Sequence, residues 1–161
     1  MPVTSRTEEI RKEASEVADA ARNAGDLMRE ISNLLHRRML KYNWVGFYML
    51  EHGAQPPMLV LTVFEGAMTP HTRIPLNQGI CGAAASSGQT IVVDDVSKDP
   101  RYLACSLETK SEIVVPIFVR GKVVGELDID SHFPAAFGLE DQELVQHCAA
   151  LVGKKLETFA Q

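Results

Sequence analysis

Two runs of strand-forming residues, 112–119 and 122–130, are separated only by Arg120 and Gly121. Both runs are rich in β-branched residues, and so short a connection leaves room only for a tight turn. The two runs must pair side by side as an antiparallel hairpin, because parallel strands need a much longer connection. This hairpin predicts an antiparallel sheet that includes residues 112–130.

A second strand pair is expected earlier in the chain. Residues 44–50 are rich in aromatic and β-branched types, and residues 58–64 have a similar composition. Between these two segments, Pro56 and Pro57 mark a turn. The pattern predicts a hairpin with a longer loop.

The segment between the two hairpins is less regular. Residues 65–75 contain Gly66 and two prolines without periodicity, which predicts a loop. Residues 79–87 are rich in Gly and Ala and predict a short helix, and a short strand is expected at 90–93. Residues 94–110 have no convincing period, so we expect a long ordered loop with one helical turn. Long loops in compact domains often carry function.

Helical patterns mark both ends of the chain. Ser5 and Glu8 have the spacing of a capping box, and a charged helical stretch follows to about Asn23. A second helix is expected over 24–39, where apolar residues recur at the spacing of one buried helix face. Near the C-terminus, another helix has an apolar stripe formed by Leu144, Val145, Cys148, Leu151, Val152, Leu156 and Phe159. The sequence thus predicts an α+β fold, with N- and C-terminal helices flanking the sheet.

We expect a single domain over residues 1–161. It would comprise N-terminal helices in 1–41, the sheet with its pocket loops in 42–137 and a C-terminal helix in 138–161. No internal repeat or low-complexity tract indicates a second domain. With 45% hydrophobic and 23% charged residues, the composition is that of an ordinary globular protein.

The charge distribution excludes several classes of function. The net charge is −5, and the Lys and Arg residues are scattered, so no basic stripe could follow a nucleic-acid backbone. The N-terminal region carries charges throughout, and no apolar run approaches the length of a membrane span. We therefore expect a cytoplasmic protein that binds neither nucleic acid nor membranes.

The three cysteines differ in their surroundings. Their odd number, in a chain without an export signal, argues against a disulfide framework. Cys148 lies on an apolar helix stripe, which predicts a core position. Cys105 lies in the long loop, where a thiol is either an exposed nucleophile or an inert small residue. Cys81 lies beside Gly79 and Gly82 and could approach Cys105 in space.

Carboxylates alternate with aliphatic residues along the last predicted strand. Glu126, Asp128 and Asp130 project from one side of that strand, because successive side chains point to opposite faces. Such a row forms either a solvent-exposed sheet face or the wall of a pocket for a cationic or zwitterionic ligand.

No metal site or cofactor is expected. Structural zinc sites normally show closely paired ligands in the sequence. The eligible side chains lack that spacing, and they are His71, Cys81, Cys105, Asp130 and His132.

Five motifs follow one another in a recognisable order. They are Asn43-Trp44-Val45-Gly46-Phe47-Tyr48, Thr72-Arg73-Ile74-Pro75, Gly79-Ile80-Cys81-Gly82, Ser111-Glu112-Ile113-Val114-Val115-Pro116 and Leu127-Asp128-Ile129-Asp130-Ser131. Together they resemble the GAF domain family, and within it the enzymatic branch of free methionine (R)-sulfoxide reductases. The resemblance implies an antiparallel sheet of about six strands with helices packed against it, and a homodimer formed through the terminal helices.

The resemblance also implies roles for single residues. It makes Cys105 the nucleophile and Cys81 a neighbouring redox cysteine, with thioredoxin as a possible reductant. The pocket residues that it implies are Trp44, Tyr48, Glu112, Asp128 and Asp130. Carboxylates can hold the free amino group of methionine sulfoxide, and aromatic faces can pack against its S-methyl end.

One position departs from the pattern of the reductases. That branch normally has a further cysteine ahead of the Arg-Ile-Pro segment, commonly the resolving partner, and here the position is His71. The resolving step would then fall to Cys81 or to an external thiol. The alternative function is a non-catalytic GAF domain that binds a small molecule or acts as a sensor.

Overall fold

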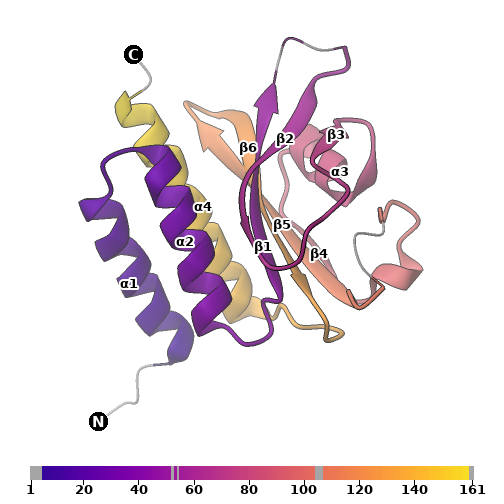
Figure 1. The fold of residues 1–161 in the computed structure, drawn as a ribbon, viewed down its shortest axis with the longest axis horizontal. Coiled ribbons are helices and arrows are strands. Elements are labelled where there is room, and N and C mark those ends of the chain that lie inside the picture. Colours follow the sequence, from indigo (N-terminus) through magenta and orange to yellow (C-terminus); the bar gives the residue numbers. More distant parts are fainter. Residues whose placement is uncertain (1–4, 52, 54, 104–106, 160–161) are drawn as a thin grey trace.

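The computed structural model describes residues 5–51, 53, 55–103 and 107–159. Within these residues one antiparallel sheet has the strand order β3-β2-β1-β6-β5-β4 (Figure 1). The strands are β1 (Trp44–Glu51), β2 (Met58–Glu65), β3 (Arg73–Pro75), β4 (Ile91–Val93), β5 (Ser111–Val119) and β6 (Lys122–Ser131). The predicted α+β class and both predicted hairpins are confirmed.

Three helices form a layer on one face of the sheet. Helices α2 (Ala24–Arg38) and α4 (Leu139–Phe159) pack directly on the strands, and α1 (Arg6–Ala20) packs on these two helices (Figure 1). The opposite face of the sheet is covered by α3 (Gly79–Ser87) and by loops, one of which contains the 3-10 turn η1 (Val96–Lys98). The sheet is thus the middle layer of the fold.

Side-chain caps determine where the N-terminal helices begin. The Ser5 side chain accepts a hydrogen bond from the Glu8 N–H, as the capping-box spacing predicts. The Asn23 side chain accepts one from the Asp26 N–H at 2.8 Å and caps α2. The expectation that the first helix extends to Asn23 is therefore wrong, because the capping residue has an extended backbone.

The alternation along the central strands divides the side chains between two cores. Phe47, Leu127 and Ile129 face the helix layer and are fully buried. Each such side chain contributes about 1.5–3 kcal/mol to stability through burial. Cys148 lies in the same core, as predicted, and burial raises the pKa of its thiol to about 12.

The structure corrects the expectation of a simple loop over residues 65–75. Residues Arg73 and Pro75 pair with Val60 and Met58 on β2, so β3 forms an edge of the sheet. A strand of three residues is too short to show alternation in the sequence. Its proline is tolerated because an edge strand leaves one row of N–H groups unpaired.

Within the described part of the chain, no helix combines the length and the apolar character needed to cross a lipid bilayer.

Candidate functional site

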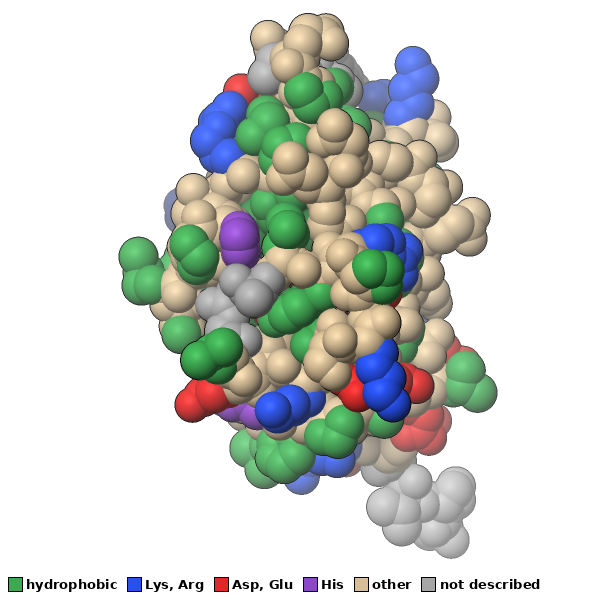
Figure 2. Space-filling model, turned by 90° about the vertical axis from the view of Figure 1, so that its right-hand side faces the viewer, with side chains coloured by type: hydrophobic (Ala, Val, Ile, Leu, Met, Phe, Trp, Pro, Cys, Tyr) green, Lys and Arg blue, Asp and Glu red, His purple; other side chains and the backbone are tan. Residues whose placement is uncertain are grey.

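The row of carboxylates on β6 is buried. Glu126, Asp128 and Asp130 are exposed by only 0%, 2% and 4%, so this face of the sheet is not the solvent-exposed one. In the space-filling view of this side, hydrophobic and uncharged side chains cover much of the surface (Figure 2). The row therefore lies beneath α3 and the neighbouring loops.

The register of the sheet brings aromatic side chains to one flank of this row. Trp44 on β1 pairs with Asp130, and Tyr48 pairs with Glu126. On the other flank, Glu112 of β5 pairs directly with Asp130. Paired residues in adjacent strands share one face, so the strands assemble acids and rings in a single patch.

Glu112 lies beside both aspartates, because it pairs with Asp130 in the sheet and one of its carboxyl oxygens lies within 4.8 Å of a carboxyl oxygen of Asp128. Burial, followed by the charges of the two aspartates, raises the pKa of Glu112 well above its ordinary value. Burial likewise raises the pKa of Asp128 and of Asp130. A carboxyl group in this cluster must therefore hold a proton when no cation is bound, because neighbouring buried carboxylates cannot all ionise.

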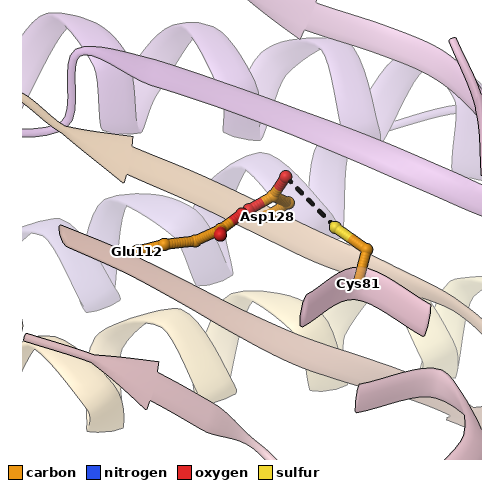
Figure 3. A group of neighbouring side chains, drawn as sticks. All are labelled: Cys81, Glu112 and Asp128. Atoms are coloured by element: carbon orange, nitrogen blue, oxygen red, sulfur yellow. Dashed lines mark hydrogen bonds between the residues drawn. The ribbon is translucent and has the colours of Figure 1, made fainter. Parts of the chain in front are cut away.

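Cys81 reaches this cluster from α3. Its Sγ donates a hydrogen bond to Asp128 Oδ2, 3.4 Å away (Figure 3). Burial, then the charges of Asp128, Glu126 and Glu112, raise the pKa of the Cys81 thiol well above its ordinary value. The residue is therefore a neutral thiol that ties α3 to β6.

Glu126 is the member of the row to which the family resemblance assigns no role. Neither of its carboxyl oxygens has a hydrogen-bond partner among the described residues. Burial raises the pKa of Glu126, and the nearby Cys81 thiol only partly offsets this effect. The alternation of side chains along the strand predicts on which face Glu126 lies. Its burial depends on α3, which covers that face.

The aromatic flank is held by hydrogen bonds and by stacking. The Trp44 indole N–H donates to the Ala67 carbonyl at 3.0 Å, and the Tyr48 hydroxyl donates to the His71 carbonyl at 2.7 Å. The Trp44 ring also stacks on Phe64, with ring centroids 5.8 Å apart. These contacts orient both rings and tie the loop before β3 to the sheet.

A cavity of about 20 Å³ lies at the centre of the patch. It is lined by Tyr48, His71, Ile74, Gly79, Ile80, Cys81, Leu103, Glu112 and Asp128. This volume holds about one water molecule, so an amino-acid ligand fits only after lining side chains move. The predicted pocket residues Tyr48, Glu112 and Asp128 thus line one cavity together with Cys81, the predicted redox cysteine, whereas Trp44 and Asp130 do not line it.

The two remaining residues singled out in the sequence are His71 and Cys105. His71, at the position where the reductase pattern has a cysteine, lines the cavity. Cys105, the predicted nucleophile, lies outside the described residues. A larger surface groove of about 690 Å³ runs along α1 and α2 and contains none of the predicted site residues.

Three side chains of the patch could together hold a metal ion. One ligand atom each from Cys81, Glu112 and Asp128 lies within 4.8 Å of the others. No spacing in the sequence indicates this set, because the three residues belong to α3, β5 and β6 and are far apart in the chain.

Comparisons with known proteins agree with this architecture. The GAF domain family matches residues 23–156. Free methionine-R-sulfoxide reductase of Escherichia coli is 37% identical, over 79% of this chain and 74% of that protein. The enzyme of the same name from Saccharomyces cerevisiae is 41% identical, over 70% of this chain and 62% of that protein.

Solved structures give the same result. The free methionine-R-sulfoxide reductase of Neisseria meningitidis, in complex with its substrate, has a TM-score of 0.90 and 31% identity. That alignment covers 100% of this chain and 96% of the other. The substrate complex of fRMsr from Staphylococcus aureus has a TM-score of 0.84 and 33% identity, covering 97% of this chain and 99% of the other. The present chain therefore belongs to the GAF domain family, in the group that includes the free methionine-R-sulfoxide reductases.

Proposed function

We propose that this protein reduces free L-methionine (R)-sulfoxide to methionine. The observation that carries the proposal is the buried cluster of Glu112, Asp128 and Asp130 beside Trp44 and Tyr48. This combination of acids and rings matches a zwitterionic ligand with an apolar end. The relatives described above include reductases that were solved with their substrate.

The carboxyl cluster would bind the ammonium group of the substrate. An ammonium group can replace the proton held within this cluster of buried carboxyls, since it supplies both positive charge and N–H donors. A peptide-bound methionine lacks that charge and would leave buried carboxylates uncompensated. The aromatic faces of Trp44 and Tyr48 would pack against the S-methyl end. Free amino acid is therefore the expected substrate.

The proposed reaction begins with the thiolate of Cys105. Its sulfur attacks the sulfoxide sulfur, and a protonated carboxyl of the cluster donates a proton to the sulfoxide oxygen. The S–O bond of the substrate breaks as the protonated oxygen is transferred to the Cys105 sulfur, so methionine leaves as the thioether and Cys105 becomes a sulfenic acid. The assignment of Cys105 rests on the family resemblance.

A second thiol then attacks the sulfenic acid, which forms a disulfide and releases water. Thioredoxin would restore the two thiols by disulfide exchange. Cys81 and an external thiol are the two candidates for this attack. A buried thiol with a raised pKa is a poor nucleophile, because the thiolate is the attacking form. This supports an external thiol as the resolving group.

The decisive measurement is turnover of free L-methionine (R)-sulfoxide by the purified protein. One assay uses thioredoxin, thioredoxin reductase and NADPH, and the other uses dithiothreitol. Turnover in both is expected, and a Cys81→Ser variant that remains active with thioredoxin would support the external route. No turnover in either assay would leave the non-catalytic binding domain as the function.

Variants of the other two cysteines test which of them acts as the nucleophile. Cys105→Ser should abolish turnover and spare substrate binding, because it removes the nucleophile and little volume. Cys148→Ser serves as the control, since Cys148 lies in the helix-side core. A fully active Cys105→Ser variant would eliminate the proposed mechanism.

The homodimer that the family resemblance implies is also a proposal. Light scattering on the purified protein tests it directly, and a mass of one chain at micromolar concentration would contradict it.

A further inference from the structure

Three side chains of the same pocket could also act as metal ligands, a role that the proposed reaction does not require. Cys81 Sγ comes from α3, the Glu112 carboxyl from β5 and the Asp128 carboxyl from β6. One ligand atom of each lies within 4.8 Å of the others, and Figure 3 shows the three side chains converging. A cluster drawn from three separate elements is held by the fold as a whole and not by one flexible loop.

The spacing of two of these atoms already fits a tetrahedral ion. With a Zn–S distance of about 2.3 Å and a Zn–O distance of about 2.0 Å, the S···O edge of the tetrahedron is about 3.5 Å. Cys81 Sγ and Asp128 Oδ2 lie 3.4 Å apart. A carboxyl oxygen of Glu112 lies within 4.8 Å of this sulfur and of an Asp128 carboxyl oxygen, and the Glu112 side chain has rotatable bonds with which it can adjust its distance to the ion.

Asp128 also has a second carboxylate oxygen that the hydrogen bond from Cys81 does not use. Its Oδ1 is buried and accepts no hydrogen bond from an N–H, hydroxyl or thiol group of the described residues. The residue itself is only 2% exposed. A cation bound between Asp128 and Glu112 would compensate two buried carboxylates, which are otherwise costly to ionise.

The cavity matches an ion better than it matches the substrate. Its volume is about 20 Å³, and Cys81, Glu112 and Asp128 all contribute to its lining. That space holds about one water molecule, which is what the fourth position of a three-ligand zinc site takes. An amino acid requires the lining to open, whereas a single small ion does not.

The types of ligand atom indicate which metal ion the site would bind. Ca²⁺ and Mg²⁺ bind oxygen ligands, often six or more, and have little affinity for sulfur. A thiolate with two carboxylates is typical of Zn²⁺ and similar borderline cations. We propose that this pocket binds one Zn²⁺ ion through Cys81, Glu112 and Asp128, and that the bound ion excludes the substrate.

The inhibitory part of this inference rests on the proposed function. Glu112 and Asp128 cannot hold a metal ion and the ammonium group of methionine sulfoxide at the same time. Zn²⁺ would therefore compete with the substrate, and the enzyme would be inactive while zinc is bound. The binding part stands without turnover, because it concerns the ligand atoms alone.

Co²⁺ titration of the protein tests the binding part. Co²⁺ replaces Zn²⁺ in such sites, and a thiolate ligand gives an intense near-ultraviolet charge-transfer band. The protein is kept reduced with a phosphine, which does not compete strongly for the metal. We expect a band that saturates at one equivalent of Co²⁺ and disappears when Zn²⁺ is added.

Single variants of the three cysteines show which thiolate gives the charge-transfer band. Cys81→Ser should abolish it, whereas Cys148→Ser and Cys105→Ser should retain it. Asp128→Asn should weaken Zn²⁺ binding by about tenfold or more in calorimetry. Circular dichroism checks that each variant is folded, and Cys81→Ala provides a second variant if Cys81→Ser is not. A band that survives in a folded variant without Cys81, or that is absent from the unmodified protein, overturns the proposal.

Substrate competition tests the inhibitory part. Excess free methionine sulfoxide should raise the apparent dissociation constant of Zn²⁺ in proportion to its concentration, and Zn²⁺ should inhibit thioredoxin-dependent turnover competitively. A band without turnover would refute the proposed reductase and leave the metal site intact. Turnover without a band would refute the metal site and leave the reductase intact.

Discussion

The indole ring of Trp44 occupies the space in which a side chain at Gly46 would stand. A Cβ atom built on Gly46 would lie 2.3 Å from Cη2 and 2.6 Å from Cζ3 of that ring. Both residues face the pocket side of β1, because they are two positions apart along the strand. The absent side chain at position 46 thus lets the ring lie close to the sheet beside the carboxyl cluster.

A Gly46→Ala substitution should therefore displace Trp44. We expect it to lower the free energy of unfolding by about 1–3 kcal/mol, as overpacking of a core does. It should also raise KM for methionine sulfoxide, since the ring proposed to pack against the S-methyl end of the substrate moves. Urea denaturation and steady-state kinetics measure the two effects. Gly53→Ala is the control, because nothing lies within 4 Å of a Cβ at that position.

Two tyrosine variants distinguish a residue that affects both stability and catalysis from one that affects stability alone. The Tyr48 hydroxyl donates to the His71 carbonyl beside the cavity, and the Tyr42 hydroxyl donates to Asp141 on the helix side at 2.6 Å. Each Tyr→Phe substitution should cost about 0.5–1.5 kcal/mol of stability through the lost hydrogen bond. Only Tyr48→Phe should lower kcat/KM. Equal kinetics in the two variants would contradict a role for Tyr48 in orienting the pocket loop.

Replacing Glu126 by an apolar residue should stabilise the protein. The carboxyl group is fully buried without a hydrogen-bond partner among the described residues, and methionine has a similar shape. Glu126→Met should raise the free energy of unfolding by about 1–3 kcal/mol, because an unsatisfied polar group leaves the core. Glu143→Met, on the exposed side of α4, should change it by less than about 0.5 kcal/mol. Thermal unfolding of both variants would show the contrast, and a destabilised Glu126→Met protein would mean that the carboxyl has an important partner.

His147 should make stability depend on pH. Burial, and then the charge of Arg11, lower the pKa of His147 below its ordinary value of 6.5. Its Nε2 shares a hydrogen bond of 2.8 Å with Ser15 Oγ, across the contact between α1 and α4. As pH falls through 6.5, the unfolded chain takes up a proton before the folded one does.

The stabilising contribution of neutral His147 is therefore complete above that value and is lost as pH falls towards the lowered pKa. His147→Gln should remove this dependence and keep a hydrogen-bonding group near Ser15. Urea denaturation of both proteins between about pH 7.5 and about pH 5 gives the comparison. Curves that stay parallel over this range would show that His147 has the same pKa in both states.

The elements of the fold could largely be predicted because local patterns specify them. The alternation along 122–130, the tight turn at Arg120 and the cap at Ser5 each correspond to an element of the structure. The two errors also have local causes. Asn23 caps the following helix instead of ending the first, and β3 has too few residues to show a period.

The order of residues along β6 is enough to predict that Glu126, Asp128 and Asp130 share one side of a strand, because successive side chains of any strand alternate. The burial of this side, the approach of Glu112 from β5 and the contact of Cys81 with Asp128 from α3 arise from the packing of the whole chain. These relations depend on strand register and on the helix that covers the sheet. Neither leaves a periodic signal in the chain, because each joins residues that lie far apart in the sequence.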